Sequence, residues 1–310
     1  MQSDQTAPQT GCGRDPLIAA ITAFLARDHA PALGEIRESL GREIDAAGPE
    51  ALAALGHRLA DPGSDWSYYP SDPLARRIHR ALARRVLQHE PALLGAEHLA
   101  AVAGKPVVIL ANHLSYSDAN LLDILLHQAG AGAVAERLTV IAGPKVYSSL
   151  RRRFSSLCFG TIKVPQSSGV SSDEAVMNAR AVAVAARRVI EIAHERLQLG
   201  EALLVFAEGT RSRTGEMQRL LPGVARYLES PGTLILPVGI VGSEALFPID
   251  EGSLNPVRIE VRIGPPIEAD ALRKRSGGSR QMIMDTIGIA IAAVLPPEYR
   301  GVYAGPAREG

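Results

Sequence analysis

Two residues capable of acid–base chemistry, His113 and Asp118, lie five positions apart in the sequence. The apolar run at residues 107–110 precedes them, and an apolar, helix-like stretch begins near Asp118. An aspartate placed in this way accepts a hydrogen bond from one ring nitrogen, so the other nitrogen can take a proton from a hydroxyl. The alternative interpretation is a turn histidine beside an N-cap aspartate, because this spacing also arises by chance.

A second polar motif follows the apolar run at residues 203–207. Its candidate binding residues are Glu208, Gly209, Thr210, Arg211 and Arg213. A guanidinium suits phosphate because its planar fork donates two parallel hydrogen bonds, and glycine permits a close backbone approach. The alternative is a solvated loop in which the arginines pair with Glu208 and Glu216.

One further binding candidate, Lys145, follows the apolar run at residues 138–142. A lysine at this position faces either the same site or solvent. Asp123 and His127 lie on one predicted helix with no third ligand in reach, so no metal site is predicted.

The two motifs, followed by Leu236-Pro237-Val238 in a later apolar run, resemble the motifs of the glycerolipid acyltransferase superfamily. That superfamily contains the glycerol-3-phosphate and the 1-acylglycerol-3-phosphate acyltransferases. The resemblance covers roughly residues 99–305 of this chain.

The resemblance implies an O-acyltransferase of phospholipid biosynthesis, with His113 as the general base and Asp118 orienting its ring. A hydroxyl of a glycerol-phosphate acceptor would attack the thioester of acyl-CoA or acyl-ACP (acyl carrier protein). That thioester is a co-substrate, and neither a cofactor nor a metal is expected. The residues implied to hold the phosphate of the acceptor are Gly209, Thr210 and Arg211.

Glycerol-3-phosphate is the favoured acceptor, because two arginines flank a serine in Arg211-Ser212-Arg213, as in that branch of the superfamily. Ala207 stands where a proline is usual, and Lys163 either replaces a usual arginine or leaves that phosphate contact absent. The alternative acceptors are therefore 1-acylglycerol-3-phosphate and the hydroxyl of another lysolipid or aminolipid. A thioester hydrolase would not need the arginines, and a non-catalytic lipid-binding protein would not need the His–Asp pair.

The motifs require a scaffold that brings distant loops together. After residue 106, short apolar runs alternate with helical stretches, which predicts an α/β fold with a mostly parallel mixed sheet covered by helices. The predicted strands lie at residues 107–110, 138–142, 161–164, 203–207, 234–240 and 258–263. Long helices are predicted at residues 173–199 and 279–295.

Residues before about 99 show only helical patterns. The predicted helices there lie at residues 16–26, 32–46, 50–60 and about 71–89. We therefore predict a disordered tail at residues 1–13, a smaller N-terminal helical domain at residues 14–98 and an acyltransferase α/β domain at residues 99–310.

Charge and composition restrict the classes of partner. The 310 residues carry 33 basic and 33 acidic side chains, whereas a nucleic-acid-binding protein usually has a basic excess, so no nucleic acid is expected. Cys12 and Cys158 lie far apart and form no CxxC pair, which favours a reducing, cytoplasmic location. The apolar runs are shorter than the about 20 residues that span a bilayer, so membrane contact would be peripheral.

Two groups of arginines could form cationic surfaces. One group, on the predicted fourth helix, comprises Arg76, Arg77, Arg80 and Arg84, and the other is Arg151-Arg152-Arg153. Such surfaces would bind an anionic membrane or an acidic acyl carrier protein, and an ordinary solvated face is the alternative. The aromatic group Trp66, Tyr68 and Tyr69 is either an interfacial anchor or packing beneath a connecting loop.

Overall fold

The structure is a computed structural model that describes residues 13–23, 32–61, 63, 65–87, 92–165, 179–246 and 257–305. Within these residues, a nine-stranded sheet has the order β1-β5-β4-β6-β3-β7-β8-β2, and β9 pairs with β7. The strands are β1 Tyr68–Tyr69, β2 Ala92–Leu94, β3 Val107–Ala111, β4 Leu138–Ala142, β5 Gly160–Lys163, β6 Ala202–Phe206, β7 Leu234–Val241, β8 Glu260–Ile263 and β9 Ile267–Glu268. The predicted α/β class is confirmed, and the six predicted strands correspond to β3 to β8.

The centre of the sheet is parallel, because β5, β4, β6, β3 and β7 pair in parallel in that order. All five residues of β3 are buried, as expected for an apolar strand covered on both faces. In register, Ala111 lies opposite Phe206 of β6 and Val238 of β7. The loops that follow these strands therefore begin at one edge of the sheet, where ligands commonly bind in α/β folds.

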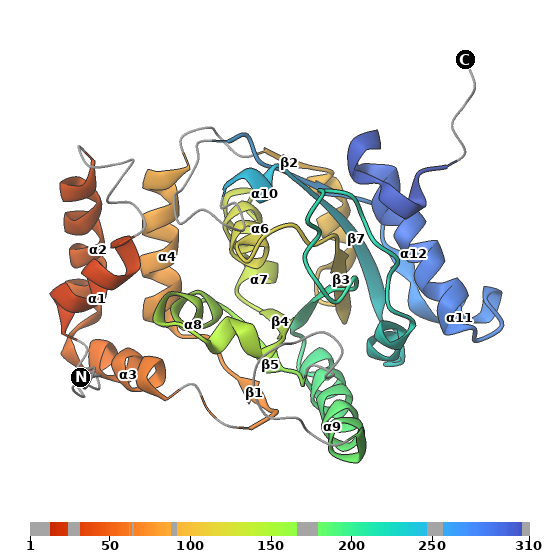
Figure 1. Cartoon of the computed structure of the whole chain (residues 1–310), viewed down its shortest axis with the longest axis horizontal. Coiled ribbons are helices and arrows are strands. Elements are labelled where there is room, and N and C mark those ends of the chain that lie inside the picture. The colour runs from red at the N-terminus through yellow and green to blue at the C-terminus, as the bar shows by residue number, and fades with distance from the viewer. Residues whose placement is uncertain are drawn as a thin grey trace, which may run out of the picture.

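Helices cover both faces of the sheet (Figure 1). The α-helices are α1 Arg14–Thr22, α2 Leu33–Ala47, α3 Pro49–Ala60, α4 Pro73–Val86, α5 Leu99–Val102, α6 Asp118–Gln128, α7 Gly132–Ala135, α8 Leu150–Ser156, α9 Ala179–Gln198, α10 Ser243–Leu246, α11 Ala269–Arg275 and α12 Arg280–Val294. The 3-10 helices are η2 Ala96–His98, η3 Pro144–Tyr147, η4 Pro222–Leu228, η5 Pro297–Tyr299 and η6 Gly301–Tyr303. The α1–α8 helices pack into one hydrophobic core, and α9, η4, α11 and α12 pack into a second core on the other face.

The four helices α1–α4 share the first of these cores with the sheet. Two short strands from the same part of the chain also join the sheet, since β1 pairs with β5 and β2 pairs with β8. The division into two domains stays a prediction, as does the tail, of which residues 1–12 lie outside the described residues. The aromatic group packs as one of its two interpretations predicts: Tyr68 lies in β1, and the ring of Tyr69 lies 5.9 Å from that of Tyr147.

The arginines of α4 do not form one exposed face, and this corrects the sequence-based interpretation. Arg76 is buried, where it donates to the carbonyl oxygen of Cys158 over 2.6 Å and pairs with Glu136. Arg80 pairs with the fully buried Asp123 of α6 over 2.9 Å. These side chains fasten α4 to the neighbouring helices, because a buried charge needs a partner of opposite sign.

No helix in the described part of the chain has the length and apolar composition needed to cross a bilayer. Membrane contact therefore stays a prediction.

The stability of this helix packing should depend on pH through His79 of α4. Its Nε2 atom is buried without a hydrogen-bond partner in the described structure, and burial lowers the pKa of His79 to about 4. Between pH 6.5 and pH 4, the unfolded chain takes up a proton at His79 that the folded protein excludes, so the free energy of unfolding falls as the pH falls.

We expect His79→Leu to reduce this fall by up to about 3 kcal/mol. Urea unfolding of the wild type and the variant at pH 7, 6, 5 and 4 measures the difference. Parallel curves for the two proteins would contradict a buried, neutral His79.

Candidate active site

The candidate site begins where β3 leaves the sheet. Asn112, the residue after β3, is buried, and its amide spans to β7: Nδ2 donates to the Ile240 carbonyl over 2.9 Å, and Oδ1 accepts from the Ile240 amide over 2.7 Å. The side chain thus continues the strand pairing for one further step. This contact fixes the position at which His113 leaves the sheet, and it could not be predicted from the sequence because Ile240 lies far away in the chain.

The predicted pair is assembled, since Nδ1 of His113 lies 2.8 Å from Oδ2 of Asp118. A carboxylate only accepts, so Nδ1 carries the proton in a neutral ring and Nε2 is left as an acceptor. The ring also stacks on Phe206, with centroids 4.1 Å apart and planes at 17°. Two contacts therefore set the orientation of the imidazole.

Asp118 is fully buried, and its two carboxylate oxygens accept hydrogen bonds from several groups of the site. Besides the ring nitrogen, Oδ2 accepts from the amides of Leu114 and Ser115 over 2.8 and 3.0 Å. Oδ1 accepts from the hydroxyl of Ser243, at the start of α10, over 2.6 Å. Asp118 is also the first residue of α6, where the helix dipole favours a negative charge.

Glu208 connects the histidine loop to the arginine loop. Its Oε1 accepts from the amide of His113 over 2.9 Å, and its Oε2 accepts from the amide of Gln218 over 2.7 Å. The amide of Ser212 donates in turn to the carbonyl of His113 over 2.8 Å. Burial raises the pKa of Glu208 to about 7. Unlike the other predicted binding residues, Glu208 does not line the cavity, so its visible role is to hold two loops together.

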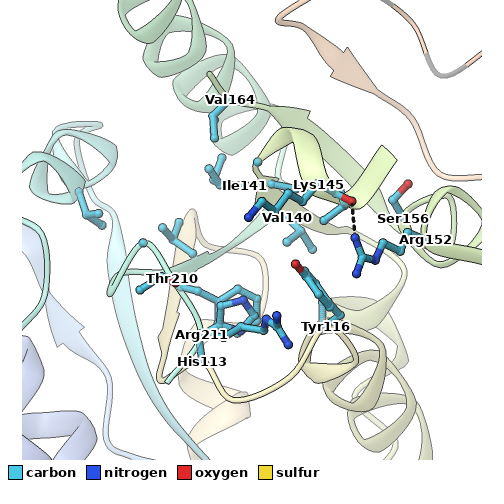
Figure 2. A pocket seen from close by; sticks show the side chains of 18 of the residues that line it. His113, Tyr116, Val140, Ile141, Lys145, Arg152, Ser156, Val164, Thr210 and Arg211 are labelled. Atoms are coloured by element: carbon cyan, nitrogen blue, oxygen red, sulfur yellow. Dashed lines mark hydrogen bonds between the residues drawn. The ribbon is translucent and has the colours of Figure 1, made fainter. Parts of the chain in front are cut away.

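A cavity of about 510 Å³ opens beside His113 (Figure 2). The predicted site residues that line it are His113, Lys145, Gly209, Thr210, Arg211 and Arg213. Its apolar wall includes Val140, Ile141, Val205, Phe206, Leu221 and Val224. One wall is therefore cationic and another apolar, with the imidazole at the same cavity.

Gly209 makes the sharp turn after β6 possible. Its φ of 74° is in the left-handed region, and a Cβ atom there would lie 2.5 Å from Cδ1 of Leu221. Both the backbone conformation and the close approach therefore require glycine.

Two cavity residues, Tyr116 and Arg152, were not identified as site residues from the sequence. The ring of Tyr116 lies between the guanidinium groups of Arg152 and Arg211 (Figure 2). The arginine cluster at residues 151–153 was visible in the sequence, but only the fold shows that Arg152 faces the cavity.

Lys163 does not take the place of the usual arginine. Its Nζ donates to the carbonyl of Gly63 over 3.0 Å and lies 4.8 and 5.6 Å from the ring centroids of Tyr147 and Trp66. Because Lys163 is buried among these groups and does not line the cavity, the alternative in which this phosphate contact is absent fits the described structure.

The link made by Glu208 predicts a pH-dependent effect of Glu208→Gln. In the variant, one backbone amide faces the new NH₂ group, which costs about 1–3 kcal/mol. In the wild type, the pKa of Glu208 is higher in the folded protein than in the unfolded chain. The contribution of Glu208 to the free energy of unfolding is therefore fully present below pH 4.5, and it falls by up to about 3 kcal/mol as the pH rises to 7.

We therefore expect Glu208→Gln to be less stable than the wild type at pH 4.5. By pH 7.5 the two proteins should be about equally stable, because only the wild type loses stability as the pH rises. Thermal or urea unfolding across that range measures it, and Glu216→Gln, on the exposed part of the same loop, is the control. A deficit that does not change with pH would refute the raised pKa.

Comparison with known proteins finds similarity over part of the chain. Residues 91–241 match the family model described as Acyltransferase, whereas no curated protein matches the sequence. Among solved structures, the chain is similar to the crystal structure of the 1-acyl-sn-glycerophosphate (LPA) acyltransferase PlsC from Thermotoga maritima. The TM-score is 0.44 and the identity 19%, over 68% of this chain and 81% of that chain. The matched segment includes His113, Asp118 and Arg211, and over this segment the chain is similar to the Acyltransferase family.

Proposed function

We propose that the protein transfers a fatty acyl group from a thioester, acyl-CoA or acyl-ACP, to a hydroxyl of glycerol-3-phosphate. The observation that carries this proposal is the placement of His113, with Nε2 free to accept, at a cavity that Lys145, Arg152, Arg211 and Arg213 line. A general base and a set of cations at one cavity suit an acceptor that has both a hydroxyl and a phosphate.

In the proposed reaction, Nε2 of His113 takes the proton of the acceptor hydroxyl as its oxygen attacks the thioester carbonyl carbon. The imidazolium that forms is stabilised by the buried Asp118 carboxylate at 2.8 Å. Collapse of the tetrahedral intermediate breaks the carbon–sulfur bond, and the same ring returns the proton to the departing thiolate. The proton taken from the hydroxyl ends on the thiol, and no covalent intermediate with the enzyme is needed.

Charge supports phosphate as the anchor of the acceptor. In the described structure, neither Arg211 nor Arg213 forms an ion pair or a side-chain hydrogen bond with a carboxylate, and both line the cavity. A small acceptor has few apolar groups, so cationic contacts must supply most of its affinity. The apolar wall formed by Val140, Val205 and Phe206 suits the acyl chain of the donor.

The general-base role predicts that His113→Ala lowers turnover by about 10²–10⁴-fold, which is the usual contribution of a positioned base. Radiolabelled acyl transfer at saturating acceptor measures it. His127→Ala, which removes an exposed histidine of α6, is the matched control and should leave turnover unchanged. Near-normal turnover in the His113 variant would exclude this mechanism.

The acceptor proposal predicts that Arg213→Ala weakens the use of glycerol-3-phosphate by about 10–100-fold in kcat/KM, because one charge-assisted hydrogen bond contributes about 1.5–3 kcal/mol. Arg219→Ala, at an exposed position beyond the cavity, serves as the control.

Product analysis with a panel of acceptors and both donors tests the substrate directly. Acylation of 1-acylglycerol-3-phosphate with glycerol-3-phosphate left untouched would overturn the favoured acceptor. Acylation of neither phosphate would point to another lysolipid or aminolipid hydroxyl, and release of free fatty acid alone would indicate a hydrolase.

A further inference from the structure

One aromatic ring lies between two guanidinium groups at the wall of the cavity. The Cζ atom of Arg211 is 3.8 Å from the centroid of the Tyr116 ring, and that of Arg152 is 4.3 Å from it. Figure 2 shows the two arginines on either side of the ring. The ring attracts both cations through its two negative faces and separates charges that would otherwise repel each other.

Arg152 and Arg211 differ in the protein groups that their guanidinium groups contact. Ser149 caps the first turn of α8, and the guanidinium of Arg152 donates to the Lys145 carbonyl over 3.3 Å and to the Ser148 hydroxyl over 3.0 Å. The guanidinium of Arg211 stacks on the ring of Tyr116, which is its contact in the described structure. Neither arginine pairs with a carboxylate of the described residues, so both charges are available to a ligand.

We infer that Tyr116 is a positioning residue that holds Arg152 and Arg211 as a preformed clamp for the phosphomonoester dianion of the acceptor. This inference rests on the proposed function. The two guanidinium groups flank the ring on opposite faces, with their Cζ atoms 3.8 and 4.3 Å from its centroid, so a phosphate at the edge of the ring would lie between the two charges and face each with a different oxygen. Two cationic forks match the two charges of a monoester better than the single charge of a diester.

The position of Tyr116 in the chain adds a second consequence. It lies in the loop between His113 and Asp118, so the base and the clamp are built on one short segment. The distance from the base to the phosphate is then fixed by that loop. An acceptor is favoured when the separation between its hydroxyl and its phosphate matches this distance.

The ring, and not the hydroxyl, carries the proposed role. No hydrogen bond from the Tyr116 hydroxyl occurs in the described structure, whereas both stacking contacts use the ring. Tyr116→Phe should therefore behave as the wild type. Tyr116→Leu keeps an apolar side chain of similar volume but removes the aromatic faces.

The experiment measures kcat and KM for glycerol-3-phosphate and the inhibition constant of inorganic phosphate. For Tyr116→Leu we expect both KM and the inhibition constant to rise about 10–100-fold. The kcat should stay within about threefold of the wild type, because the two arginines are no longer held in place to bind the phosphate while the base is unchanged. Tyr116→Phe should restore both constants. A fall in kcat alone, or unchanged constants in Tyr116→Leu, would overturn the inference.

Tyr68→Leu is the matched control. The ring of Tyr68 stacks on Arg196, with the Cζ atom 4.4 Å from its centroid, but it lies in β1 and does not line the cavity. Loss of this second stack should leave the KM for the acceptor and the inhibition by phosphate unchanged. An equal rise in both constants would show that removing any such stack loosens the fold, and would overturn the specific role.

The single variant Arg152→Gln, which leaves the Tyr116 ring in place, keeps the inference testable if Tyr116→Leu folds poorly, and a double-mutant cycle extends the test. Arg152→Gln alone should raise the acceptor KM, since one arm of the clamp is lost. Adding Tyr116→Leu or Tyr116→Ala to it should then raise KM by less than in the wild-type background. Additive effects would overturn the clamp. If the wild type acylates no glycerol phosphate, the proposed function fails, and direct binding of inorganic phosphate, measured by calorimetry on the wild type and on Tyr116→Leu, still tests the clamp by itself.

Discussion

The buried carboxylate of Asp118 is the interaction on which the geometry of the site depends. It receives hydrogen bonds from the His113 ring, from two amides of the intervening loop and from the Ser243 hydroxyl. One side chain therefore sets the tautomer of the histidine, the path of the loop and the approach of α10. A buried carboxylate needs hydrogen-bond donors because burial removes it from water. The donors to Asp118 are the groups that form the candidate site.

Much of the scaffold could be predicted from the sequence, because buried parallel strands are continuous apolar runs. The run at residues 107–110 is one residue shorter than β3, and the run at residues 203–207 is shifted by one residue from β6. Since parallel strands end at one edge of the sheet, the meeting of the two motifs also follows from the sequence. The strands β1 and β2 could not be predicted, because two or three residues carry no periodic signal.

The limits of sequence reasoning are clearest for charged residues. The sequence analysis placed Arg80 on a cationic surface and offered Lys163 as one substitute for an arginine that contacts phosphate. In the structure, Arg80 pairs with Asp123 and Lys163 packs beside Tyr147. Glu208 looks like a partner for the arginines, but its oxygens accept from backbone amides. Which charge is solvated and which is buried depends on contacts between distant segments, and a single sequence contains no local pattern for them.

The α6 helix connects the site to the first part of the chain. Asp118 at its start holds the imidazole, and Asp123, just over one turn later, receives Arg80 from α4. A helix is stiff over so short a distance, so a shift of α4 would be transmitted to the carboxylate that orients the His113 ring. A movement of the N-terminal helices would therefore change the orientation of His113, although these helices supply none of the residues that line the cavity.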